Sequence, residues 1–171
     1  MVHDIVKYGD PVLETETPLI TEFDTPELHQ LIADMFESMY AARGVGLAAP
    51  QIGVSKRVAV IDTSAGHEES EKLVLINPEI TNKEGIQNGE EGCLSLPGFR
   101  ENVSCPEKVT IRAQNAKGEW FDKTGEGVLA RAFVHEIDHL LGRLYISRIS
   151  VLKRDLIKRK VRKLQKAGEW R

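Results

Sequence analysis

The sequence has few of the features that mark secreted or membrane proteins. Its 171 residues include only two cysteines, Cys93 and Cys105, too few for a disulfide framework. No apolar run approaches the roughly 18 residues that a membrane-spanning helix needs. The first residues contain neither a basic region nor a long apolar one, so no secretory signal is expected. These absences predict a cytoplasmic protein without a membrane partner, whose reduced thiols are free to bind a metal or act as a nucleophile.

Charge is unevenly distributed along an otherwise ordinary globular composition. Hydrophobic residues make up 41% and charged residues 29%, with a net charge of −3. Residues 148–171 hold ten Lys or Arg against two Asp or Glu, which gives +8. The rest holds thirteen against 24, which gives −11. A basic tail on an acidic body is typical of proteins that meet nucleic acid or an acidic partner, and a docked helix with a solvated basic face explains the pattern equally well.

Hydrophobic periodicity predicts three helices and several short strands. A capped, proline-initiated helix is expected over 24–43, a helix that is apolar nearly all round over 128–141, and an amphipathic helix from about 150. The last has an apolar stripe of Val151, Leu152, Leu156, Ile157, Val161 and Leu164. Strands are predicted at 57–62, 73–76 and 108–113, and the last of these forms a hairpin with 119–121. This order predicts an α+β fold in which antiparallel β-sheets surround the 128–141 helix.

Two segments show no periodicity. Residues 1–23 read as an irregular stretch laid over the body and pinned by four apolar side chains, Ile5, Val12, Leu13 and Leu19. Segment 44–53 (GVGLAAPQIG) is dense in small residues that let another molecule approach the backbone closely. It lacks the Gly-Lys-Ser/Thr of a phosphate-binding loop, and a plain turn-rich linker is the alternative.

The helix at 128–141 carries the most informative pattern. His135 and His139 are four residues apart, so both imidazoles project from one helical face and can bind one metal ion. Glu136 is placed to reach a water molecule at the metal rather than the metal itself. Burying these three side chains without partners would cost several kcal/mol. The alternative is a polar stripe of two hydrogen-bonded histidines on a buried helix.

Two histidines are only part of a catalytic metal site, which needs a third protein ligand. Cys93, between glycine and leucine in segment 90–98, is the candidate, although a buried cysteine often acts only as a small hydrophobe. A zinc peptidase takes its third ligand downstream, where the only carboxylates are Asp155 and Glu169. A structural metal site with an RNA-binding tail would need four ligands, and only three are evident. Cys105 is interpreted as structural.

Three segments together resemble the bacterial-type peptide deformylase family, in the family's order and along essentially the whole chain. They are 44–51 (GVGLAAPQ), 91–95 (EGCLS) and 135–140 (HEIDHL). The resemblance implies a metal-dependent hydrolase that removes the N-formyl group from N-formylmethionyl peptides and releases formate. It implies a catalytic domain over 1–147, with 148–171 as a basic amphipathic helix of the same domain.

The resemblance also implies residue roles. The metal ligands would be Cys93, His135 and His139, and the family typically uses Fe2+, with Zn2+, Ni2+ or Co2+ able to substitute. Glu136 corresponds to the general base, and Gln51 and the Leu94 N–H to the oxyanion donors. The substrate-binding positions implied are Val45, Gly46, Gly92 and Arg100.

Several positions depart from the family pattern. Arg43 stands where many bacterial members have an acidic residue that pairs with the arginine at position 100, so two like charges are expected to face each other. Leu141 and Ser147 also differ from the commoner residues. The basic tail and the implied substrate together predict contact with the ribosome surface, whereas no DNA partner is expected.

Overall fold

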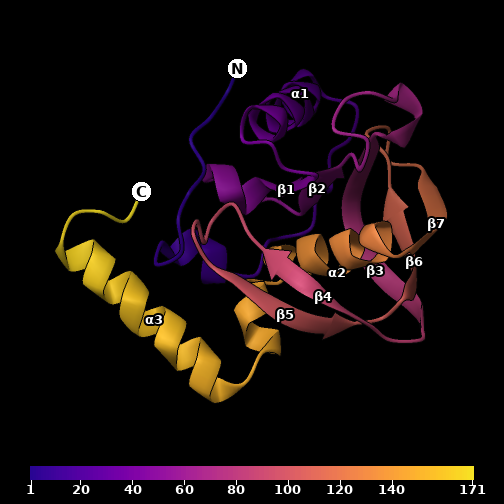
Figure 1. Ribbon diagram of the computed structural model, residues 1–171. Helices are drawn as coiled ribbons and strands as arrows, with labels where there is room; N and C mark the ends of the chain where they lie inside the picture. The colour runs from indigo at the N-terminus through magenta and orange to yellow at the C-terminus, as the bar shows by residue number, and fades with distance from the viewer.

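A computed structural model describes residues 1–171 as two antiparallel sheets and three α-helices (Figure 1). The helices are α1 (Pro26–Ala41), α2 (Val128–Leu140) and α3 (Val151–Lys166). The strands are β1 (Gly46–Ala48), β2 (Val58–Ile61), β3 (Leu73–Glu84), β4 (Gln87–Gly92), β5 (Arg100–Cys105), β6 (Lys108–Gln114) and β7 (Trp120–Glu126). Four short 3-10 helices join them: η1 (Pro11–Glu14), η2 (Ala49–Ile52), η3 (Glu69–Glu71) and η4 (Tyr145–Arg148). The predicted α+β class is confirmed.

The larger sheet has the strand order β1-β2-β3-β6-β7, and β4 and β5 form a separate hairpin. The hairpin lies in front of α2 in Figure 1, and the larger sheet curves behind it. Apolar residues of α2 pack against β2, β3 and β6 in one buried cluster that includes Phe133, Ile137, Leu75 and Ile111. The prediction of a central helix between antiparallel sheets therefore holds, except at Val128, which begins the helix and is 64% exposed.

Helix α1 covers the β1–β2 end of the larger sheet. Thr25 caps it, because its hydroxyl accepts a hydrogen bond from the Leu28 N–H at 3.1 Å. The buried stripe of α1 then packs on both strands and includes Leu28, Ile32, Met35 and Met39. The following segment is not the turn-rich linker of the alternative interpretation, since it contains β1 and η2 and is buried from residue 47 to residue 52.

The N-terminal segment is irregular, as predicted, but its anchors differ. Leu13 is fully buried and Leu19 is 60% exposed, so the expected role of Leu19 is wrong. Thr17 ties the segment to α2 instead, because its N–H and its hydroxyl both donate to the Leu140 carbonyl at 2.9 Å. Gly142 ends that helix with a φ of +79°, and a Cβ there would lie 2.9 Å from the Glu14 backbone. Only glycine fits both requirements.

The sheets are more extensive than predicted. The sequence left open whether Asn77 and Pro78 end the strand or bend it. They bend it, and β3 resumes after a register shift between Ile76 and Glu79. Strands β4 and β5 were not predicted at all. The hairpin of β6 and β7 is confirmed, and β7 runs on to Glu126.

Helix α3 extends away from the body at the C-terminal end (Figure 1). Ile157 and Val161 are its only buried residues, and they join a cluster with Leu13 and Tyr145. The prediction that the whole apolar stripe packs on the body is partly wrong, because three of its residues are exposed: Val151, Leu152 and Leu156. Ser150 caps the helix by accepting from the Lys153 N–H. No helix in the structure is long and apolar enough to cross a membrane.

Candidate metal centre and substrate cavity

The two histidines of α2 meet as the helical spacing predicts. His135 Nε2 lies 3.2 Å from His139 Nε2, with the rings facing edge to face. His139 is fully buried, and its Nδ1 has no hydrogen-bond partner. The two Nε2 atoms thus face a common point, as two ligands of one metal ion would.

Cys93 completes a triad of donor atoms. It follows directly on β4, and its Sγ lies 3.3 Å from His139 Nε2. The donor atoms of Cys93, His135 and His139 all lie within 4.8 Å of one another. One thiolate and two imidazoles suit a first-row divalent metal, and three protein ligands leave the open position of a catalytic site. The residues present therefore fit a metal ion.

Glu91 holds His135 in place, a contact that the sequence analysis missed. Its Oε1 accepts from His135 Nδ1 at 2.6 Å, and its Oε2 pairs with Arg131 Nη1 at 2.7 Å. Burial alone would raise the pKa of Glu91, but these two hydrogen bonds outweigh it and lower the pKa below its ordinary value. Hydrogen bonding of Nδ1 to a carboxylate leaves His135 Nε2 with its lone pair toward the candidate metal position. In the sequence, only the place of Glu91 within segment 91–95 could have indicated a role at the site.

Glu136 lies beside this triad and is 3% exposed. Its Oε1 has no hydrogen-bond partner, and burial raises its pKa to about 7. A carboxyl group with such a pKa can accept and return a proton near neutral pH. The other oxygen lies against β1, where a Cβ on Gly46 would approach Glu136 Oε2 to 2.5 Å. Glycine at this position therefore gives the carboxylate its space.

Gln51 is oriented by its neighbours. Its Oε1 accepts from the Ala48 N–H at 3.0 Å, so its Nε2 points the other way. That nitrogen donates to Ser95 Oγ at 3.2 Å and lies 3.6 Å from Cys93 Sγ. The Leu94 N–H donates no backbone hydrogen bond. Two donors thus lie next to the candidate metal ligands.

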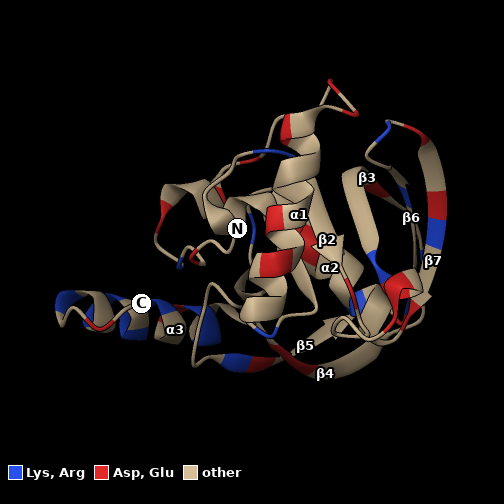
Figure 2. Ribbon diagram, turned by 90° about the horizontal axis from the view of Figure 1, so that it is seen from above, with Lys and Arg blue, Asp and Glu red and all other residues tan.

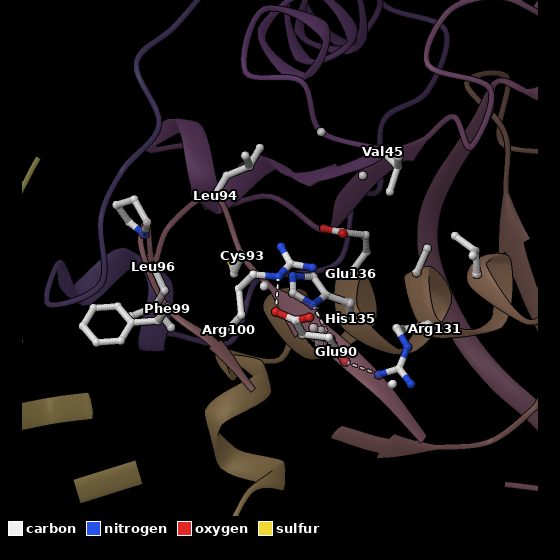
Figure 3. A pocket seen from close by; sticks show the side chains of 18 of the residues that line it. Val45, Glu90, Cys93, Leu94, Leu96, Phe99, Arg100, Arg131, His135 and Glu136 are labelled. Carbon is white, nitrogen blue, oxygen red and sulfur yellow. Dashed lines mark hydrogen bonds and ion pairs between the residues drawn. The ribbon is translucent and has the colours of Figure 1, made fainter. Parts of the chain in front are cut away.

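A cavity of about 790 Å³ opens onto these residues (Figure 3). Cys93, His135 and Glu136 lie at its floor, Val45 projects from the segment before β1, and Leu94 from the segment after β4. All four predicted substrate-binding residues line it, namely Val45, Gly46, Gly92 and Arg100. The structure thus brings the three sequence motifs together around one opening.

Two arginines at the cavity, Arg43 and Arg100, lie where like charges were expected to face each other. Arg43 and Arg100 both line the cavity, but Arg100 is neutralised by Glu90, whose Oε1 lies 2.7 Å from Arg100 Nε. Arg100 extends over Gly92, where a Cβ would meet its Nη1 at 2.9 Å. Arg100 of β5 thus pairs with Glu90 of the neighbouring strand β4. An acidic residue at position 43 is not needed for this pairing.

Comparison with known proteins agrees with this geometry. The family described as polypeptide deformylase matches residues 2–155. The chain belongs to this family. A peptide deformylase of Acidobacterium capsulatum is 62% identical over 170 residues, which cover 99% of each chain. A second, from Thermodesulfovibrio yellowstonii, is 48% identical over 157 residues, 92% of this chain and 94% of the relative.

Solved structures of deformylases have the same fold. That of Legionella pneumophila superposes with a TM-score of 0.90 at 43% identity, covering 100% of this chain and 99% of that one. The structure of the deformylase from Thermus thermophilus superposes with a TM-score of 0.87 at 41% identity, covering 95% of this chain and 94% of that one. The chain is therefore a hydrolase of N-terminal protein processing, in a metal-dependent family that removes N-formyl groups.

Proposed function

We propose that the chain hydrolyses the formamide C–N bond of N-formylmethionine at the N-terminus of nascent polypeptides and releases formate. The observation that carries this proposal is the convergence of Cys93, His135 and His139 beside the buried Glu136, in a cavity that Cys93, His135 and Glu136 line. The proposed metal is Fe2+, with Zn2+, Ni2+ or Co2+ able to substitute. When bound, the metal supplies Lewis-acid activation of water.

Glu136 is the proposed general base. Its raised pKa lets it take a proton from the attacking water and pass it to the leaving amine. Its unpartnered Oε1 is free for this hydrogen bond. Gln51 Nε2 and the Leu94 N–H are the proposed donors to the oxyanion that develops on the formyl oxygen. Loss of one such donor typically lowers the rate about 10²- to 10³-fold.

The substrate main chain is proposed to bind along β1, the open edge of the larger sheet. The Val45 carbonyl accepts from the Asp62 N–H, so Val45 faces β2. Because neighbouring residues of an antiparallel pair alternate, the N–H and C=O of Gly46 face away from β2. An extended peptide can therefore pair with Gly46 and bind with little regard to most of its side chains. Gly92 and Arg100 line the opposite side of the cavity.

The test is formate release from a formyl-Met peptide, with metal content measured on the same anaerobically purified samples. Glu136→Ala is expected to retain the metal and lose deformylation by about 10²- to 10⁴-fold, because it removes only the proton carrier. Cys93→Ala is expected to lose both metal and activity. Formate release by the Glu136 variant at the parent rate would contradict the role assigned to this carboxylate.

We further propose that α3, as part of the same domain as residues 1–147, contacts the ribosome in the cytoplasm. Figure 2 shows basic residues along this helix. Exposed members include Arg159, Lys160, Lys163 and Lys166. They form a basic surface suited to phosphate groups of RNA.

Deletion of residues 150–171 would be a poor test of ribosome contact, because Ile157 and Val161 belong to a buried cluster. Replacing the four exposed basic residues with glutamine keeps that packing. We expect ribosome co-sedimentation to weaken and its salt dependence to decrease, with formate release from a short peptide unchanged. Co-sedimentation equal to that of the parent protein would refute the contact.

A further inference from the structure

The cavity mouth carries one positive charge that no group of the chain neutralises. Three arginines line the cavity. Arg131 pairs with Glu91 and Arg100 pairs with Glu90, each at 2.7 Å. Arg43 makes neither an ion pair nor a side-chain hydrogen bond. Its guanidinium is therefore available to a charge that a ligand brings.

The backbone at Arg43 is unusual for an arginine. The residue has a φ of +59°, the left-handed conformation that glycine and asparagine adopt most readily. It ends α1, with its N–H donating to the Tyr40 carbonyl at 3.0 Å. The next N–H, that of Gly44, donates to the Met39 carbonyl at 2.9 Å, so the C-terminal cap of α1 accounts for the left-handed conformation. The cap fixes the backbone of Arg43 at a position that lines the cavity.

The direction of the bound peptide follows from the site, given the proposed function. The formyl end must lie near Gln51, whose amide nitrogen is 3.6 Å from Cys93 Sγ. Gln51 is at the C-terminal end of the β1 region, so a peptide paired with Gly46 runs antiparallel to β1. Its later residues then pass Val45 and Gly44 toward Arg43.

The spacing places the positive charge beside the early residues of the substrate. Strand β1 begins only at Gly46, and Arg43 stands three positions before it in the turn after α1, on the side toward which the later residues of the peptide run. Because Arg43 also lines the cavity, its side chain lies near the residues that follow the methionine. The long, flexible arginine side chain can reach neighbouring positions as well.

We propose that Arg43 is a specificity-determining residue, which favours substrates with Asp or Glu among the second to fourth residues and disfavours Lys or Arg there. The proposal rests on the proposed function, because it names the substrates that the same site prefers. It differs from main-chain binding at Gly46, which is indifferent to side-chain charge.

The experiment compares kcat/KM for formyl-Met tetrapeptides in which Glu, Gln or Lys occupies the second, third or fourth position among alanines. At low ionic strength kcat/KM for the Glu peptide is expected to be about five times that for the Lys peptide at one or more positions. This factor is the effect expected when an attraction between exposed charges is replaced by a repulsion. The ratio should fall toward one at about 0.5 M salt, because salt screens exposed charges.

Four variants of the whole metal-loaded protein separate the charge from the backbone. Arg43→Gly suits the left-handed conformation and should bring the Glu-to-Lys ratio close to one, whereas Arg43→Lys should retain it. Arg43→Glu should invert it. Arg143→Glu is the charge-matched control, since Arg143 is exposed and outside the cavity, and it should leave the ratio unchanged.

The ratio within one variant cancels any general loss of activity or stability. An unchanged ratio in Arg43→Glu, or no charge preference in the parent protein, would overturn the role of Arg43 while formate release still supports deformylation. Absence of formate from every peptide would instead refute the proposed function itself.

Discussion

At Gly46 the main chain of β1 comes into contact with the side chain proposed to carry the proton. The position a Cβ would occupy is only 2.5 Å from Glu136 Oε2. Real side chains do not approach each other so closely, so a methyl group must displace either the carboxylate or the strand. The glycine thus serves the position of Glu136 as well as the approach of the substrate.

We expect Gly46→Ala to lower kcat/KM for a formyl-Met peptide by about 10²-fold, because general acid–base catalysis of that size depends on the position of the carboxylate. Thermal unfolding should change little. Gly89→Ala is a matched control, since its Cβ would meet only the end of Arg131, at 3.3 Å from Nη2. Equal activity of the two variants would show that Glu136 tolerates displacement.

The sequence was enough to predict the candidate ligands and the candidate base, but not the side chains that pair with the site residues. The pairing of His135 with His139 and the place of Glu136 follow from helical spacing, whereas Cys93 was only a candidate until the family resemblance implied it as the third ligand. The bond from Glu91 to His135 joins residues 44 positions apart, and no local pattern signals such a contact. The pairing of Arg100 with Glu90 likewise depends on strand register, which the sequence analysis did not predict.

Elements with strong periodicity were predictable, and those with polar, glycine-rich sequences were not. The apolar stripe and the proline start of α1 give both its type and its beginning. Strand β4 (QNGEEG) has residues that are depleted in strands, so propensity argues against it. It forms because it pairs with β5 along its whole length and lies against α2. Tertiary contacts of this kind override local preference.

Helix α3 offers a direct test of which residues attach it to the body. Ile157 is 4% exposed in a buried cluster, and its neighbour Leu156 is 45% exposed. We expect Ile157→Ala to lower the free energy of unfolding by about 2–4 kcal/mol, because it leaves a cavity. Leu156→Ala should change it by no more than about 0.5 kcal/mol. Urea denaturation of both variants provides the measurement, and equal losses would contradict this packing.

On the scale of the whole molecule, the candidate metal ligands join parts that are distant in the chain. Cys93 follows strand β4 of the hairpin, and both histidines belong to the central helix. A bound metal would therefore link the hairpin to the helix and stabilise the folded state.

Removal of the metal by a chelator is expected to lower the unfolding temperature. A metal at about 100 times its dissociation constant stabilises the folded state by about 2.7 kcal/mol. For a chain of this size that corresponds to roughly 5–10 °C in Tm. Cys93→Ser, which weakens the site, should respond less to the chelator in the same thermal scan. An identical Tm with and without chelator would count against a bound metal in the parent protein.

The open edge at β1 is only three residues long and is reached through the cavity. In the proposed binding mode, a chain end pairs with this edge only while that end is still extended, since an N-terminus already folded into a domain has no free strand to offer. The time available for deformylation is therefore the time for which the N-terminus stays extended. Deformylation competes with folding of the client protein, and a client whose first residues fold quickly has a shorter interval in which to be processed.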